Sequence, residues 1–122
     1  NGFSDMTSLT RLDEKTVLNN LEKRFKRDIT YTYIGSVLVS INPFQAIDGL
    51  YDNKARFHEK SLGDQAPHVY AIAEKAYASM LTSAQNQSFV ISGESGAGKT
   101  ETMKQILNYL SEASTRAHEG VE

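Results

Sequence analysis

The feature that most restricts the fold is a cluster of glycines between an apolar run and a helical repeat. The glycines lie within Gly93-Glu94-Ser95-Gly96-Ala97-Gly98-Lys99-Thr100, which matches the pattern GxxxxGK[ST]. The segment before them, Ser88–Ser92, predicts a short apolar strand. A helix is predicted to open at Lys99, with an inward face of Met103, Ile106, Leu107 and Leu110. The glycine loop therefore follows a predicted strand and leads into a predicted helix, the context in which this pattern binds phosphate.

Each residue type in this loop suits the binding of a triphosphate. Glycines at 93, 96 and 98 let the backbone turn tightly and bring N–H groups close to phosphate oxygens. The following helix adds free N–H groups and the positive end of its dipole. Lys99 supplies positive charge to the β- and γ-phosphates, the Thr100 hydroxyl suits Mg²⁺, and the Ser95 hydroxyl is placed to face the terminal phosphate. A chance match in so short a chain is expected on the order of once in a few hundred sequences.

Residues that would hydrolyse a nucleotide are harder to find. A P-loop enzyme needs an acidic residue after a second strand and a group that positions the attacking water. None of the 15 acidic residues directly follows a predicted strand, and the most hydrophobic predicted strand, Val37–Ile41, ends in Asn42. The histidines at 58, 68 and 118 lack metal-ligand spacing and are interpreted as surface or packing residues. We therefore expect phosphate binding but no catalytic residue within this chain.

Composition restricts the class of protein further. The 122 residues are 39% hydrophobic and 23% charged, as in one small globular domain. The net charge of −2 argues against nucleic acid and acidic membranes as partners. The absence of cysteine excludes disulfides and thiolate metal sites and is compatible with an intracellular protein. The mostly apolar stretch Ile34–Ile41 is too short for a membrane helix, and no signal peptide is visible. The missing initiator Met predicts a true N-terminus upstream.

Helices and strands are also predicted upstream of the glycine loop. Asp13 is expected to cap a helix that turns Val17, Leu18, Leu21 and Phe25 inward, with a solvated basic face of Lys23, Arg24, Lys26 and Arg27. Tyr31–Ile41 predicts a strand or strand pair that Asn42-Pro43 stops. A short helical segment is expected within residues 53–60, and after Ser114 a surface loop. Pro67 is expected in the first turn of a helix whose inward residues are Val69, Ile72, Ala73, Ala76, Tyr77, Met80 and Leu81.

Taken with the following Glu101, the loop of residues 93–100 looks like the phosphate-binding loop of myosins. The chain upstream is similar to the same family, so that the resemblance covers roughly Met6 to Ser114. The stretches that carry it are Leu9–Leu12, Val17–Leu21, Arg24-Phe25, Ile29–Gly35, Leu38–Phe44, Pro67–Ala73, Ala76-Tyr77 and Asn86–Ser88.

The resemblance implies that residues 1–122 are the ATP-binding part of an actin-activated Mg-ATPase motor. Its fold would be an α/β fold of the P-loop NTPase type, an incomplete domain with part of a mostly parallel twisted central sheet and flanking helices. Gly93 to Thr100 would bind phosphates, Thr100 would ligate Mg²⁺, and Asn42, Pro43 and Tyr51, in a purine loop near 42–51, would border the adenine. Relative to the family pattern Asp48-Gly49 adds a residue, which predicts either a displaced Tyr51 or a bulge at the glycine.

The same resemblance implies partners and a place in the cell. Actin filaments would bind through regions outside this chain, light chains would bind through a neck, and the protein would be cytoplasmic and cytoskeletal. By itself the chain is expected to be poorly soluble, because strand edges would be unpaired, and to show neither ATPase activity nor actin binding. The alternatives left open are another P-loop NTPase or kinase and a scaffold that binds nucleotide without hydrolysing it. A GTPase is disfavoured because no Asn-Lys-x-Asp element is present.

Overall fold

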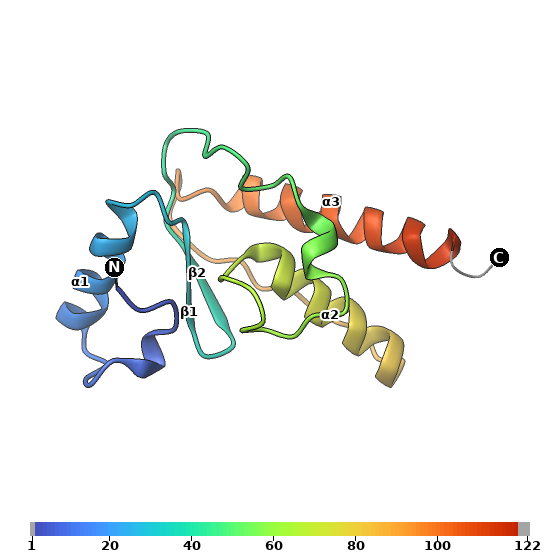
Figure 1. Cartoon of the computed structure of the whole chain (residues 1–122), viewed down its shortest axis with the longest axis horizontal. Coiled ribbons are helices and arrows are strands. Elements are labelled where there is room, and N and C mark those ends of the chain that lie inside the picture. The colour runs from blue at the N-terminus through green and yellow to red at the C-terminus, as the bar shows by residue number, and fades with distance from the viewer. Residues whose placement is uncertain (1, 120–122) are drawn as a thin grey trace.

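The computed structural model describes residues 2–119, which form helices packed around a small hairpin (Figure 1). Two single turns of 3-10 helix, η1 and η2, complete the described part. In chain order the elements are η1 (Met6–Ser8), α1 (Glu14–Phe25), β1 (Tyr31–Ile34), β2 (Val37–Ser40), η2 (Lys54–Phe57), α2 (Val69–Ser83) and α3 (Lys99–Glu119). The hairpin lies between α1 on one side and the pair α2 and α3 on the other.

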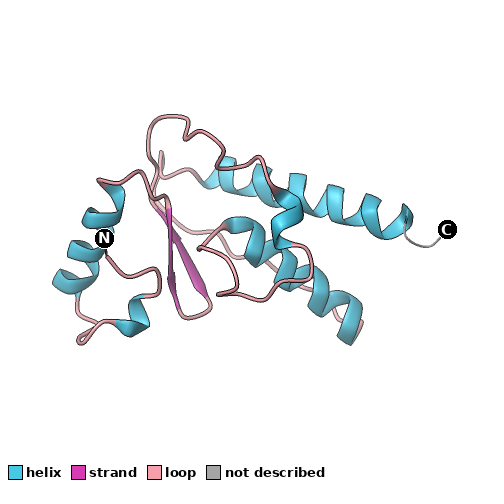
Figure 2. Cartoon of the chain, viewed as in Figure 1, coloured by secondary structure: helices cyan, strands magenta, loops and turns pink. Residues whose placement is uncertain are grey.

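The hairpin confirms the predicted strand pair. β1 and β2 are antiparallel, with Tyr31 opposite Ser40 and Ile34 opposite Val37. The turn between them uses Gly35 at φ +59°, a backbone conformation that glycine adopts without steric cost. β2 ends at Ser40, before the predicted stop at Asn42-Pro43. Within residues 2–119, the sheet consists of these two strands (Figure 2).

The predicted strand at Ser88–Ser92 is wrong for this structure. The segment runs extended but joins no ladder among residues 2–119, so the mostly parallel sheet is not formed there either. A strand is defined by its hydrogen-bonded neighbour, and β1 is the strand that pairs with β2. Residues 88–92 line a cavity instead, and Val90 is 93% exposed. Phe89 and Ile91 are partly buried against the core, so the apolar character of the run indicated burial but not strand pairing.

The first helix, α1, begins as predicted but turns a different face inward. Asp13 caps it, accepting a hydrogen bond from the Thr16 N–H at 2.9 Å. Arg24, expected on the solvated basic face, is buried, whereas Leu18 and Phe25 are exposed. The Arg24 Nε donates to the Thr32 hydroxyl at 2.8 Å and its Nη2 donates to the Tyr31 carbonyl at 3.0 Å. The guanidinium is drawn inward because it satisfies polar groups of β1.

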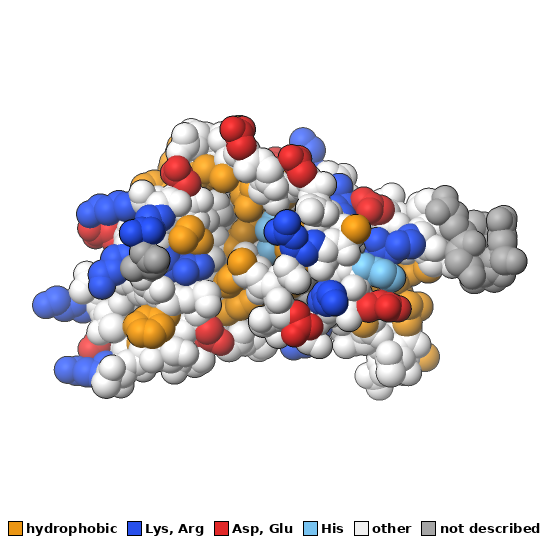
Figure 3. All heavy atoms as spheres, viewed as in Figure 1, with side chains coloured by type: hydrophobic (Ala, Val, Ile, Leu, Met, Phe, Trp, Pro, Cys, Tyr) orange, Lys and Arg blue, Asp and Glu red, His pale blue; other side chains and the backbone are white. Residues whose placement is uncertain are grey.

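Other basic residues of α1 are solvated, as predicted. Lys23, Lys26 and Arg27 are all exposed, and Lys26 pairs with Glu22 at 2.9 Å one turn earlier. Lysines and arginines accordingly gather at the α1 end of the molecular face in Figure 3. Exposed pairs of this kind contribute little stability.

The second helix, α2, buries mainly its first turns. His68 is the N-cap, so Pro67 precedes the cap instead of lying in the first turn as predicted. Near the other end, Met80 is 40% exposed and Leu81 is 62% exposed, contrary to the predicted inward face. The buried residues of α2 lie near its start, where α3 and η2 pack against it: Val69, Tyr70, Ala71, Ala73 and Glu74.

The third helix, α3, opens at Lys99 as predicted but extends to Glu119, so the loop expected after Ser114 is wrong. Residues 99–119 contain neither glycine nor proline, and Arg116 lies 3.9 Å from Glu112 one turn earlier. Met103 and Leu107 are about half exposed. Ile106 is buried as predicted, and Leu110 is partly buried against the core. The other buried residues of α3 are Gln105, Tyr109 and Ala113.

An aromatic core joins the hairpin to α2 and α3. Tyr31, Phe57, His68, Tyr70 and Tyr109 form a continuous set of contacts, with neighbouring ring centroids 4.4 to 5.9 Å apart. These are the separations of favourable tilted and edge-to-face pairs. The core therefore holds β1 and the segment that follows β2 against α3, the helix that begins at the end of the glycine loop.

Candidate nucleotide-binding site

The glycine loop of residues 93–100 has the backbone that its sequence predicts. Gly96 has φ +86° and Gly98 has φ +101°, both in the region that favours glycine. The Ala97 N–H donates to the Glu94 carbonyl at 3.1 Å, which closes a turn within the loop. The Thr102 N–H donates to the Gly98 carbonyl at 3.0 Å, so the helical hydrogen bonds begin at the last glycine. The N–H groups before Thr102 have no acceptor inside α3, as at the start of any helix.

Gly93, the first glycine of the loop, lies where there is little room for a side chain. A Cβ atom at this position would lie 3.2 Å from the Cβ of Ala97 and 3.8 Å from the Cγ of Lys99. Its φ of +158° is close to extended backbone. Close approach of the two ends of the loop therefore explains a residue without a side chain here.

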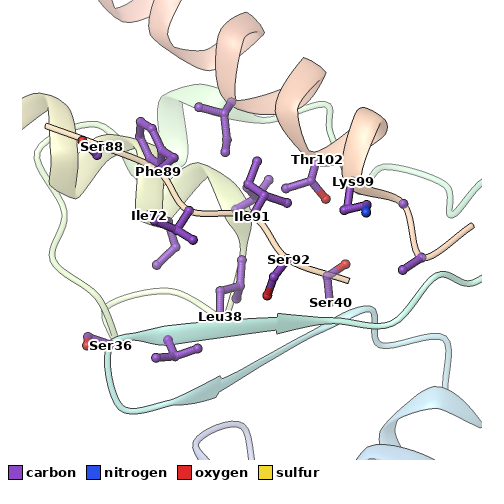
Figure 4. A pocket seen from close by; sticks show the side chains of 16 residues that line it. Ser36, Leu38, Ser40, Ile72, Ser88, Phe89, Ile91, Ser92, Lys99 and Thr102 are labelled. Carbon is purple, nitrogen blue, oxygen red and sulfur yellow. The ribbon is translucent and has the colours of Figure 1, made fainter. Parts of the chain in front are cut away.

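Lys99 lies at one end of a cavity of about 360 Å³. Figure 4 shows Lys99 and Thr102 at that end and Ser36 and Ser88 at the other, with Leu38, Ile72 and Ile91 between. No carboxylate is among the lining residues. The side chains of Lys99 and Thr100 are exposed, as are Glu94, Ser95, Gly96 and Ala97. An exposed lysine at the first position of a helix can reach an anion bound to the helix N-terminus.

Asn42 connects the loop after β2 to the glycine loop. Its side-chain Nδ2 donates to the Gly96 carbonyl at 2.9 Å, although the two residues are 54 positions apart. Its Oδ1 accepts the Phe44 N–H at 2.8 Å, a turn around Pro43 that holds Phe44 at φ +54°. Thus the structure brings Asn42, which the resemblance singled out, into contact with residues 93–100.

Tyr51 lies further away, at the other end of residues 42–51. Its hydroxyl shares a 2.7 Å hydrogen bond with the Tyr31 hydroxyl, and its ring meets His68 and Tyr70 edge-on. The chain turns at Gly49, where φ is +76°, just before Tyr51. Burial raises the pKa of the Tyr51 hydroxyl. The tyrosine is thus tied to the aromatic core, and no contact joins it to the glycine loop.

His68 joins the same loop to α2. Its Nδ1 accepts the Tyr70 N–H at 3.0 Å, so the other ring nitrogen carries the hydrogen and donates to the Leu50 carbonyl at 2.6 Å. The ring is buried, which agrees with its interpretation as a packing residue. Burial lowers the pKa of His68, and the nearby positive charge of Arg56 lowers it further.

We expect stability to fall as the pH is lowered, because of His68. The unfolded histidine takes up a proton near its ordinary pKa of 6.5, whereas the folded one stays neutral to a lower pH. Its contribution is therefore complete above that value and is lost as the pH falls below it, at up to about 1.4 kcal/mol per pH unit. His68→Asn keeps a capping side chain and should flatten this dependence. Urea denaturation midpoints at about pH 7.5 and about pH 5.5 test it, and an unchanged slope would contradict the assignment.

Tyr70, Gln105 and Glu101 were not singled out as site residues from the sequence. They form a hydrogen-bonded series behind the glycine loop, in which Gln105 Nε2 donates to Glu101 Oε1 at 2.9 Å. The i,i+4 spacing of Glu101 and Gln105 is a signal that could have indicated their contact. The contact with Tyr70, on another helix, had no such signal.

Two kinds of feature are absent from the part of the chain that is described. Among the described side chains, those of residues 2–117, no group of three or more His, Asp or Glu is arranged to hold a metal ion. Within the same residues no helix combines the length and the hydropathy that crossing a membrane requires.

A glycine loop that opens a helix with a lysine at its first position is the arrangement by which P-loop proteins hold phosphate groups. Here it is joined to an Asn-Pro turn that follows a hairpin. The chain belongs to the myosin head (motor domain) family, whose model matches residues 3–122.

Individual myosins show the same similarity over most of the chain. It is 51% identical to unconventional myosin-XV of Homo sapiens over 89% of this chain. It is 48% identical to myosin IC heavy chain of Dictyostelium discoideum over 93%, and 45% identical to myosin-17 of Arabidopsis thaliana over 99%. The matched segments are 3%, 10% and 8% of those three proteins, so the chain spans a tenth or less of each.

Proposed function

We propose that this chain is the nucleotide-binding segment of an actin-based motor that hydrolyses Mg·ATP. The observation that carries the proposal is the glycine loop at residues 93–100, joined to the Asn42-Pro43 turn by the contact between Asn42 and Gly96. Membership of the myosin head family supports the motor, because the names of the related proteins are those of myosins. A P-loop NTPase-type fold around a mostly parallel central sheet is part of this proposal.

Residues of the glycine loop would hold the phosphates. Backbone N–H groups of residues 93–98 and the start of α3 would donate to phosphate oxygens, and the Lys99 ammonium would neutralise their charge. Thr100 follows Lys99 in the first turn of α3 with an exposed side chain, so its hydroxyl fits a magnesium ion shared with the phosphates. The ion would supply charge neutralisation on the phosphoryl group; this chain supplies the loop that orients it.

Residues 42–51 would border the base, with Asn42 and Pro43 close to the phosphate loop and Tyr51 at the far end. Adenine is the proposed base, which rests on the family resemblance around Asn42-Pro43. Actin filaments, light chains and a cytoskeletal location belong to the same proposal. They would involve regions outside the chain. Hydrolysis would need an acidic metal-shell residue and a water-positioning group, and we assign neither to residues 2–119.

Phosphate release by the full-length protein tests the proposal. ATP and GTP are supplied separately, each with and without actin filaments. We expect turnover with ATP that rises when actin is added, and weaker competition by GTP for the same site. Equal affinity for the two nucleotides would remove the assignment of residues 42–51 to adenine. Turnover that is indifferent to actin would favour another P-loop NTPase, and binding without turnover would favour a nucleotide-binding scaffold.

A further inference from the structure

A chain of buried hydrogen bonds ties the far end of residues 42–51 to the helix behind the glycine loop. The Tyr70 hydroxyl donates to the Gln105 Oε1 at 2.9 Å and lies 3.3 Å from the Tyr51 carbonyl oxygen. Gln105 in turn donates to Glu101, the residue after Thr100, at 2.9 Å. Tyr70 is 1% exposed and Gln105 is 8% exposed, so water does not compete freely for these bonds.

Together with the contact at Asn42, these bonds close a ring. Asn42 holds the start of the loop to Gly96, while Tyr51, at its end, is bonded to Tyr31 of β1 and lies against Tyr70 of α2. Gln105 then leads back along α3 to the glycine loop. Residues 42–51 are therefore fixed at both ends to the segment that carries Lys99 and Thr100.

Tyr70 is suited to this place because it donates at neutral pH. Burial raises the pKa of its hydroxyl to about 12, so the hydrogen that reaches Gln105 and the Tyr51 carbonyl is retained. Its ring also packs against Tyr51 and Phe57, which fixes the direction of the hydroxyl. Lys54, whose Nζ lies 5.6 Å from the centre of the Tyr70 ring, adds a cation–π contact from η2.

We propose that Tyr70 and Gln105 are positioning residues that hold residues 42–51 against α3 and so set how much the base adds to nucleotide affinity. The inference rests on the proposed function, because it takes the phosphates to lie on residues 93–100 and the base beside residues 42–51. Neither residue needs to touch the nucleotide. Their loss should weaken a ligand that has a base and spare a ligand that has only phosphates.

The test compares Mg·ATP with Mg·pyrophosphate, which lacks base and ribose, as ligands of the full-length protein. Tyr70→Phe keeps the ring and removes the hydroxyl. We expect it to weaken ATP binding about fivefold and pyrophosphate binding less than about twofold, because one buried neutral hydrogen bond is lost at the base end only. Gln105→Met should behave alike, and the double variant should be no weaker than the more affected single one, because both changes break the same series.

Tyr109→Phe is the matched control. Tyr109 is buried in the same core and donates to Glu74 at 2.6 Å, a bond that involves none of residues 42–51. Its loss should leave the ratio of the ATP and pyrophosphate affinities unchanged even if stability falls. Three outcomes would overturn this inference alone. In Tyr70→Phe, the affinities for both ligands could change equally, or the affinity for ATP could stay unchanged. In Tyr109→Phe, the ratio of the two affinities could change as it does in Tyr70→Phe. An unsubstituted protein that binds neither ligand would overturn the proposed function, and this inference with it.

Discussion

Replacement of Lys99 by alanine is expected to abolish Mg·ATP binding by the full-length protein. Lys99 is the first residue of α3 and lies at the end of the cavity beside the last glycine of the loop. Without its ammonium group the charge of the β- and γ-phosphates would be unmatched, a loss of about a hundredfold or more in affinity. Titration with a fluorescent ATP analogue measures the effect.

Lys104→Ala provides the matched control for this experiment. Lys104 is an exposed lysine of the same helix and does not line the cavity. It should bind the analogue as the unsubstituted protein does, which separates the position of the charge from the number of charges. An affinity of Lys99→Ala within about threefold of the unsubstituted protein would refute the assignment of the phosphate site.

Arg24→Met is expected to be the most destabilising change outside the aromatic core. Methionine keeps most of the apolar stem but cannot donate to the Thr32 hydroxyl or to the Tyr31 carbonyl. Both acceptors belong to buried residues and would lose a charged donor. The unfolding free energy should therefore fall by about 2–3 kcal/mol. Urea denaturation of the two proteins side by side gives the difference.

Lys23→Met tests whether the effect belongs to this position. Lys23 is the neighbouring basic residue and is exposed, so its replacement should change the unfolding free energy by less than about 0.5 kcal/mol. Equal destabilisation by the two substitutions would show that Arg24 acts through net charge and not through its bonds to β1.

Local signals in the sequence predicted much of the backbone. Capping, β-propensity and glycine spacing predict Asp13 and the helix after it, the hairpin and its stop near Asn42, and the helix that opens at Lys99. The glycine conformations at 96 and 98 also agree with the pattern. Each of these features depends on residues close in the sequence, which is why a single sequence is sufficient to predict them.

Features that depend on distant residues were predicted poorly. Arg24 was predicted to be exposed because it is a charged residue on the polar face of a helical repeat. The carbonyl and the hydroxyl to which it donates lie on β1, and the periodicity of α1 carries no information about them. Leu81 and Leu107 were assigned to the core, yet no described segment covers them. The strand at residues 88–92 was predicted from apolar character alone, and pairing requires a neighbour that composition cannot indicate. The glycine loop was identifiable in the sequence, but its partner Asn42 entered only through the family resemblance.

The contact between Asn42 and Gly96 also bears on the order in which the molecule can fold. It closes a stretch of 54 residues, and the bond between Tyr70 and Gln105 closes one of 35. Closing such stretches reduces the entropy of the chain before any contact between their ends can form and offset the loss. The contacts within α1 and within the hairpin, by contrast, join residues close in the sequence. During synthesis from the N-terminus, residues 42–51 emerge before Tyr70 of α2, which contacts Tyr51, and well before the glycine loop, which contacts Asn42. The proposed nucleotide site is therefore among the last of the described parts to be assembled, and it forms only after the glycine loop and the first two turns of α3 have emerged.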